Sequence, residues 1–165
     1  MKSKVQFRAC RQSDLERLQV LVDALYREDM DSSSVPVQSG KPDISLTYGE
    51  FQKHPAKGEI LVFVAEEILD CNTESEICGY AIIVHFWSNE YGGDVNEIDE
   101  IYIAPCWRNQ GLASSFFAYL EETAPSSLRG WTLQVSKENI AAARLYKRVG
   151  FVPCANDYLV CLRSI

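Results

Sequence analysis

The sequence is poor in histidine and lacks both a paired cysteine motif and a long apolar run. Its two histidines, His54 and His85, are too few to complete a zinc site with the six cysteines, none of which forms a C-x-x-C pair. No apolar run reaches the length of a membrane span, and no apolar segment follows the basic start at residues 1–5. We therefore expect a cytoplasmic protein with reduced thiols, no bound metal and no signal peptide.

Positive charge is also scarce. Sixteen Lys and Arg residues stand against 23 Asp and Glu residues, which gives a net charge of −7. This balance argues against binding to nucleic acid or to an anionic membrane surface, and it is compatible with a small cationic substrate. The length of 165 residues, 47% of them hydrophobic, predicts one domain over residues 1–165 with a real core.

Hydrophobic periodicity predicts an alternation of strands and helices after an initial run of strands. We expect strands at residues 5–8, 59–67, 77–87, 96–104, 131–135, 151–152 and 158–163, and helices at residues 15–26, 45–53, 112–123 and 139–149. A polar loop separates the first two helices at residues 27–43, and turns are expected at residues 70–76 and 89–94. This order predicts an α/β fold with a mixed sheet and helices on both faces.

The most informative stretch is a glycine turn at residues 108–113, between the strand at 96–104 and the helix that follows. The first amides of a helix have no internal partner and carry partial positive charge, so such a turn can bind a diphosphate. Small residues at Gly111 and Ala113 let a ligand approach the backbone closely, and Arg108 adds positive charge. Glycine turns of this kind are common, however, and most bind nothing. The sequence here is neither a G-x-G-x-x-G pattern nor a P-loop.

A second block, residues 139–151, gives the turn a more specific meaning. Asn139 and Tyr146 lie about two helical turns apart, so both project from one side of a helix. Together the two blocks resemble the GNAT superfamily of acetyl-CoA-dependent N-acetyltransferases. The Arg/Gln-x-x-Gly-x-Gly/Ala motif of that family is matched by Arg108, Gly111 and Ala113. Its later block is matched by Asn139, Ala142, Leu145, Tyr146, Gly150 and Phe151.

The resemblance implies a mostly antiparallel sheet of about seven strands in which the fourth and fifth strands splay apart. Acetyl-CoA would be the cofactor. The amides of the turn would hold its pyrophosphate, at Asn109, Gln110, Gly111, Leu112, Ala113 and Ser114. The main chain of Ile101 and Ile103 would pair with the pantetheine arm, which Asn139 and Ala142 would also contact. Tyr146 would protonate the leaving thiolate, because a phenol and a thiol have comparable pKa values.

Three carboxylates precede the predicted cofactor strand. Strict alternation would put Glu97 and Asp99 on one face with Ile101 and Ile103, and Glu100 on the other face. The resemblance implies that an acidic residue at Glu97 or Asp99 serves as the base or binds the amine. We therefore rank Asp99 first, Glu97 second and Glu100 third, although a strand bulge would change this order and any of the three can simply face solvent.

The resemblance also implies an acceptor channel formed by the region after the first helix and by the strand pair near residue 87. Tyr26, Glu28, Trp87 and Tyr91 are the candidates, because aromatic and acidic groups suit a protonated amine. His85 is expected to be a strand residue with a satisfied hydrogen bond.

The predicted function is N-acetylation of a small cationic amine, polyamine-like or aminoglycoside-like, by direct attack on acetyl-CoA. The alternatives are acetylation of a protein lysine or N-terminus, or a non-catalytic acyl-CoA-binding module. The closing strands could also pair with a second copy to form a homodimer.

Overall fold

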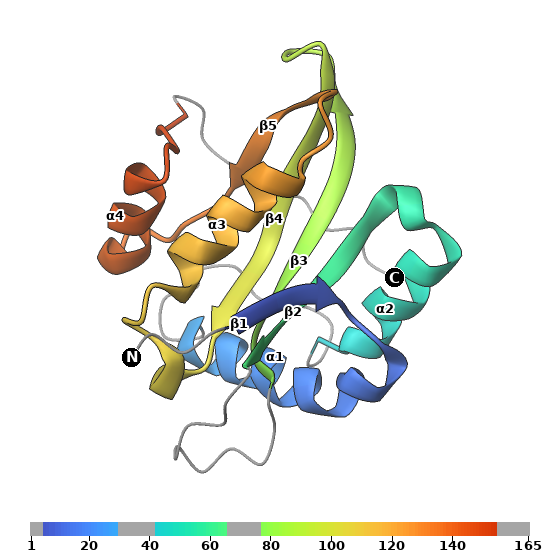
Figure 1. Ribbon diagram of the computed structural model, residues 1–165, viewed down its shortest axis with the longest axis vertical. Helices are drawn as coiled ribbons and strands as arrows, with labels where there is room; N and C mark the ends of the chain where they lie inside the picture. Colours follow the sequence, from blue (N-terminus) through green and yellow to red (C-terminus); the bar gives the residue numbers. More distant parts are fainter. Residues whose placement is uncertain (1–4, 30–41, 66–76, 155–165) are drawn as a thin grey trace, which may run out of the picture.

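Five strands of the described residues form a mixed sheet at the centre of the molecule (Figure 1). The computed structural model describes residues 5–29, 42–65 and 77–154, and the structural statements below concern these residues. The strands, in their order across the sheet, are β1 (Val5–Ala9), β2 (Gly58–Ala65), β3 (Ile77–Ser88), β4 (Gly93–Ile103) and β5 (Leu128–Leu133). All neighbours are antiparallel except β4 and β5, which are parallel. The mixed sheet predicted from the sequence is confirmed.

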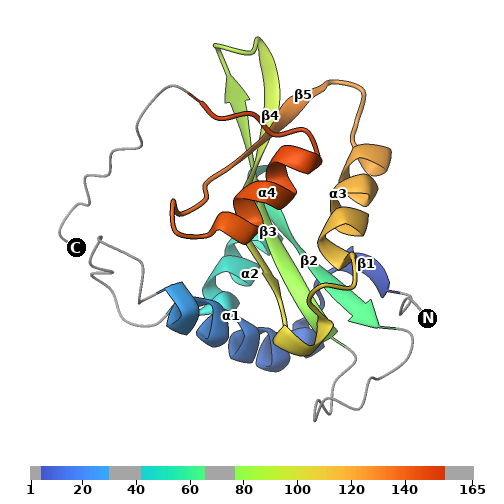
Figure 2. The same ribbon diagram turned by 90° about the vertical axis from the view of Figure 1, so that its left-hand side faces the viewer.

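Helices cover both faces of the sheet, as expected. Figures 1 and 2 show α1 (Leu15–Asp29) and α2 (Ile44–Lys53) on one face and α3 (Leu112–Thr123) on the other. The last helix, α4 (Ile140–Arg148), packs beside α3, where the ring of Phe117 lies 5.8 Å from that of Tyr146. We refer below to the two faces of the sheet as the α1 face and the α3 face.

Apolar side chains fill both layers. On the α3 face, the ring of Phe63 lies 5.0 Å from that of Phe7 and 4.7 Å from that of Phe116. On the α1 face, Leu18 and Val22 of α1 are almost completely buried. Two buried layers hold the strands in fixed register, because a one-residue slip would turn the apolar side chains of a strand to the wrong face.

Most predicted elements lie where the sequence places them, with a few differences. The first helix continues through Arg27 and Glu28 to Asp29, and β5 begins at Leu128, before the predicted start at residue 131. The strand predicted at residues 151–152 is absent. Gly150 has a φ of 106° and the Phe151 amide donates to the Tyr146 carbonyl at 2.9 Å, so Phe151 closes the end of α4 instead. The predictions for residues 30–41, 70–76 and 158–163 fall outside the described residues.

Two irregularities in β4 shape the functional region. The pairing of β4 with β5 runs from Asp94–Leu128 to Ile98–Leu133, whereas β4 itself continues to Ile103. Because β5 ends at Leu133, β4 from Asp99 to Ile103 has no paired strand on this side among the described residues. Immediately beyond Ile98, the β3–β4 register skips Asp99, so that Ile83 pairs with Ile98 and Ile82 with Glu100. A β-bulge thus lies at the point where the strands separate.

Candidate active site

The bulge at Asp99 overturns the strict alternation expected for the three carboxylates. Residues directly opposite each other in an antiparallel pair point to the same face. Glu97 is paired with Val84 and Glu100 with Ile82, and these two residues of β3 share the α1 face. Glu97 and Glu100 therefore point to the same face, whereas Ile101 and Ile103 point to the α3 face. Asp99 is the extra, exposed residue between them.

The carboxylate of Glu100 accepts hydrogen bonds from two tyrosine hydroxyls. It is therefore more firmly positioned than its third rank among the three carboxylates suggested. The hydroxyl of Tyr26 donates to one carboxylate oxygen at 2.8 Å, and that of Tyr80 donates to the other at 2.7 Å. Burial and the nearby Glu100 carboxylate raise the pKa of Tyr80 far above its ordinary value, so this donor stays protonated. Sequence reasoning missed Tyr80, although a tyrosine inside the apolar run at 77–87 is a signal for a buried hydrogen bond.

Asp99 has the electrostatic environment of a proton acceptor. Desolvation by the surrounding protein and, secondarily, the charge of Glu97 raise the pKa of Asp99 above its ordinary value, although part of the residue remains exposed. Glu97 in turn accepts a hydrogen bond of 3.1 Å from the side chain of Gln134, just beyond β5. The carboxylates of β4 thus gather where β5 leaves the strand.

Arg108 links the glycine turn to α1 through an ion pair, so its charge is not free to bind a ligand at the turn. Its guanidinium lies 2.9 and 3.0 Å from the two oxygens of Glu28, and its Nε donates to the Ile103 carbonyl at 2.8 Å. The hydroxyl of Tyr102 also donates to Glu28, at 2.8 Å, and burial together with this bond raises the pKa of Tyr102 to about 12. Glu28, predicted to bind the substrate, is therefore already paired.

The turn itself has the geometry of an anion site. Gly111 is the N-cap of α3 with a φ of 85°, no side chain caps the helix, and a Cβ placed at this position would meet no protein atom within 4 Å. Asn109 also has a positive φ, of 60°, and the side chain of Gln110 holds the turn by donating to the Cys106 carbonyl at 2.9 Å. The amides of Leu112, Ala113 and Ser114 lie in the first turn of α3, where a helix leaves its amides without an internal partner.

The free edge of β4 leads from the carboxylates to this turn. The Ala104 amide donates to the Cys78 carbonyl of β3 at 2.9 Å. Because main-chain groups alternate along an antiparallel ladder, those of Ile101 and Ile103 point away from β3, toward the gap left by β5. The carbonyl of Ile103 accepts a hydrogen bond from Arg108, so the main chain of Ile101 and the amide of Ile103 are the groups of this edge that point to a ligand.

The second sequence block lies on α4. Asn139 is its N-cap and accepts a hydrogen bond of 3.1 Å from the Ala142 amide, so both residues have a structural role. The ring of Tyr146 is half-buried between Phe117 and Phe151, with centroids at 5.8 and 5.9 Å. These ring contacts fix the position of the phenol independently of any ligand.

The predicted acceptor residues do not form one group. Tyr26 and Glu28 both lie on α1, and each is hydrogen-bonded to a residue of β4. Trp87 and Tyr91 are exposed at the far end of the β3–β4 hairpin. Along β3, Trp87 is three residues beyond Val84, the partner of Glu97, and five beyond Ile82, the partner of Glu100, or about 10 and 17 Å at the rise of a strand. The structure therefore does not bring Trp87 and Tyr91 to the carboxylates.

The described strands form a mixed sheet with one parallel pair, and the longer strand of that pair leads into a glycine-capped helix. A model of the acetyltransferase (GNAT) family matches residues 22–151, and the chain belongs to this family. A search of curated protein sequences gave no significant match.

Solved structures agree in fold over nearly the whole chain. A possible acetyltransferase from Clostridium difficile 630 is 20% identical, with a TM-score of 0.68 over 98% of this chain and 97% of the other. The aminoglycoside N-acetyltransferase AAC(6')-Iy in complex with CoA is 18% identical, with a TM-score of 0.69 over 99% and 98% of the chains. The ribosomal-protein-alanine N-acetyltransferase from Brucella melitensis is 14% identical, with a TM-score of 0.67 over 96% and 100%. At these identities the likeness shows the fold alone.

Within the described ranges, no helix combines the length and the apolar character needed to cross a membrane.

Proposed function

We propose that the protein transfers the acetyl group of acetyl-CoA to a primary amine of a small cationic molecule. The observation that carries the proposal is one continuous site along β4. Carboxylates stand where the β4–β5 pairing ends at Ile98, the unpaired edge of the strand runs through Ile101, and the uncapped N-terminus of α3 follows. The order of these features matches that of acetyl-CoA, which has a thioester at one end of its flexible arm and a diphosphate at the other. The thioester would lie near the carboxylates and the diphosphate at the N-terminus of α3.

The residues present fit coenzyme A. Gly111 leaves open space in front of the first amides of α3, where a diphosphate would accept their hydrogen bonds. The main chain of Ile101 offers one peptide unit for an amide of the arm, as an added strand would. The CoA complex of the aminoglycoside N-acetyltransferase with the same fold supports this assignment.

Acetyl-CoA supplies the acetyl group as a thioester. In the proposed reaction, Asp99 removes a proton from the bound ammonium, so that the neutral nitrogen forms a bond to the acetyl carbon while the carbon–sulfur bond breaks. Tyr146 gives its proton to the departing sulfur, and the second proton that the nitrogen loses on becoming an amide passes to solvent, from which Tyr146 is protonated again. Glu97 and Glu100 place negative charge on the α1 face, where it attracts the cationic acceptor.

A thiol-release assay tests this function. The protein and acetyl-CoA are incubated with polyamines, aminoglycosides, amino acids and basic peptides, and free thiol is measured against a sample without amine. We expect small polycationic amines to stimulate release most strongly. Stimulation by peptides alone would indicate that the acceptor is a protein and not a small molecule. Thiol release that no amine stimulates would contradict the proposed N-acetyltransferase activity.

The pH dependence tests Asp99 as the base. Since Asp99 must be deprotonated to accept a proton, kcat/KM should fall as the pH drops through its raised pKa. Glu97→Gln removes a neighbouring negative charge, which lowers the pKa of Asp99, so the acidic limb of the profile should move to lower pH. Asp99→Asn should reduce kcat by about 100-fold.

Glu90→Gln, which removes an exposed carboxylate in the hairpin turn, is the matched control and should leave the profile in place. An acidic limb that Glu97→Gln does not move would exclude Asp99 as the group that sets it.

A further inference from the structure

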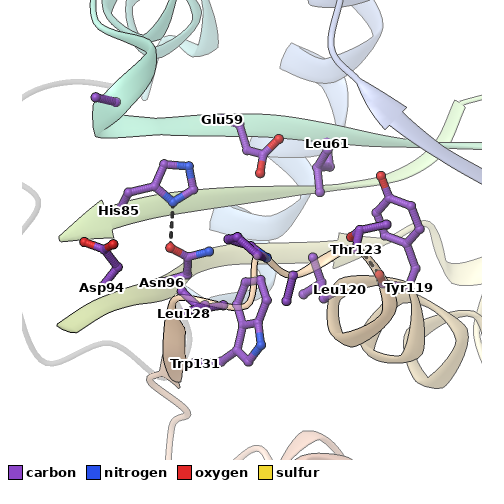
Figure 3. A pocket seen from close by; sticks show the side chains of 13 residues that line it. Glu59, Leu61, His85, Asp94, Asn96, Tyr119, Leu120, Thr123, Leu128 and Trp131 are labelled. Atoms are coloured by element: carbon purple, nitrogen blue, oxygen red, sulfur yellow. Dashed lines mark hydrogen bonds between the residues drawn. The ribbon is translucent and has the colours of Figure 1, made fainter. Parts of the chain in front are cut away.

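A second cleft, of about 530 Å³, lies on the α3 face near the free end of the β3–β4 hairpin (Figure 3). Its floor comes from four neighbouring strands, with Glu59 from β2, His85 from β3, Asn96 from β4 and Trp131 from β5. The C-terminal half of α3 and the segment after it form the wall, which includes Tyr119. No part of the proposed reaction uses this cleft.

The cleft lies on the opposite face of the sheet from the carboxylates Glu97 and Glu100. Asn96 is paired with His85, and both side chains line the cleft on the α3 face. The next residue of β4, Glu97, points to the opposite face because side chains alternate along a strand. A ligand in this cleft would therefore not contact Glu97 or Glu100.

The centre of the floor offers one donor and one acceptor. The Nδ1 atom of His85 lies 2.7 Å from the Oδ1 atom of Asn96, and in the tautomer with its proton on Nδ1 the ring donates to this oxygen and has Nε2 as an acceptor. Asn96 is only 8% exposed, and among the described residues its amide nitrogen has no hydrogen-bond partner. Figure 3 shows this nitrogen turned away from His85 into the cleft. Among the described residues, Trp107 Nε1 is the buried side-chain polar atom that lacks a partner, so the Asn96 nitrogen is reached from the cleft and can donate to an acceptor oxygen of a ligand there.

The surroundings of this pair favour a cation. Glu59 and Asp94 both line the cleft and are exposed, and neither forms an ion pair with any described residue. The described lining contains no lysine or arginine. Trp131 adds an indole, whose face attracts both ammonium groups and the C–H bonds next to them. The cleft thus combines negative charge, an aromatic surface and an amide donor at its floor.

We propose that this cleft binds a hydroxylated organic cation of the amino-sugar class. The ammonium group pairs with Glu59 or Asp94, a ring or hydroxyl oxygen accepts from the Asn96 amide, and a hydroxyl donates to His85 Nε2. The C–H face of the sugar lies on Trp131. Binding here is separate from acetyl transfer and does not depend on the function proposed above.

The test is a titration of the protein with a candidate ligand in the absence of acetyl-CoA. Nuclear magnetic resonance spectra record the indole N–H signals of its three tryptophans at each ligand concentration. The Trp131→Phe variant assigns the Trp131 signal. Glucosamine should shift this signal with a dissociation constant of about 1 mM. Glucose, which lacks the ammonium group, and cyclohexylamine, which lacks the oxygens, should each bind at least about fivefold more weakly.

Variants locate the site. Glu59→Gln combined with Asp94→Asn should weaken glucosamine binding by about tenfold, because two exposed charges are removed without a change of shape. Glu121→Gln, an exposed carboxylate of α3 outside the cleft, and Glu97→Gln should both leave binding unchanged. The proposal is overturned by a Trp131 signal that does not move, by an equal response to glucose, or by binding that is lost in Glu97→Gln and kept in the double variant.

Discussion

Replacing Tyr146 by phenylalanine should reduce kcat by about 100- to 1000-fold while the affinity for acetyl-CoA stays nearly the same. The ring of Tyr146 packs edge-on against Phe117 and Phe151, and phenylalanine preserves both contacts. The substitution thus removes the hydroxyl without opening a cavity between α3 and α4. If this hydroxyl protonates the leaving sulfur, its loss affects the chemical step and leaves cofactor binding intact. Thiol release at saturating acetyl-CoA measures the former, and calorimetric titration with CoA measures the latter.

Tyr119→Phe is the matched control, because it removes the hydroxyl of a half-buried tyrosine of α3 whose ring packs 5.2 Å from Phe7. It should leave kcat within about twofold of the original value. Equal turnover by the Tyr146→Phe protein would show that the sulfur receives its proton from another group. A parallel loss of CoA affinity and melting temperature would assign the tyrosine a packing role instead.

Local backbone constraints explain why the sequence predicts the fold so well. α2 ends before Pro55 because the proline ring cannot continue a helix. α4 ends at Gly150 because glycine adopts a φ of 106° more readily than any other residue. Gly111 marks the start of α3 for the same reason. Each of these signals acts within a few residues, so it can be read without knowledge of the partner strands.

The arrangement of the carboxylates could not be predicted in the same way. The face to which Glu100 points depends on a bulge, and the bulge depends on how β4 pairs with β3. The same holds for the pairing of Arg108 with Glu28, which joins residues 80 positions apart. Sequence spacing predicts a positive charge at the glycine turn, but it does not show that α1 supplies a carboxylate to hold it.

The Gly111→Ala substitution should raise the KM for acetyl-CoA at least about tenfold. The new methyl group would meet no protein atom within 4 Å, so it does not clash inside the folded chain. It would instead occupy the space directly in front of the α3 amides, where the diphosphate is proposed to bind. The kcat at saturating acetyl-CoA should change much less, because the glycine turn lies at the far end of β4 from the carboxylates.

The chain offers a close control for the backbone cost of this change. Gly92, in the β3–β4 turn, also has a positive φ, of 63°, and a Cβ added there would likewise meet no protein atom within 4 Å. Alanine at either position costs about 1 kcal/mol of stability through the left-handed backbone alone. Gly92→Ala should therefore lower the melting temperature as much as Gly111→Ala and leave the KM unchanged. Equal KM values for the two variants would mean that the turn at Gly111 does not hold the diphosphate, and the anion site would have to lie elsewhere along β4.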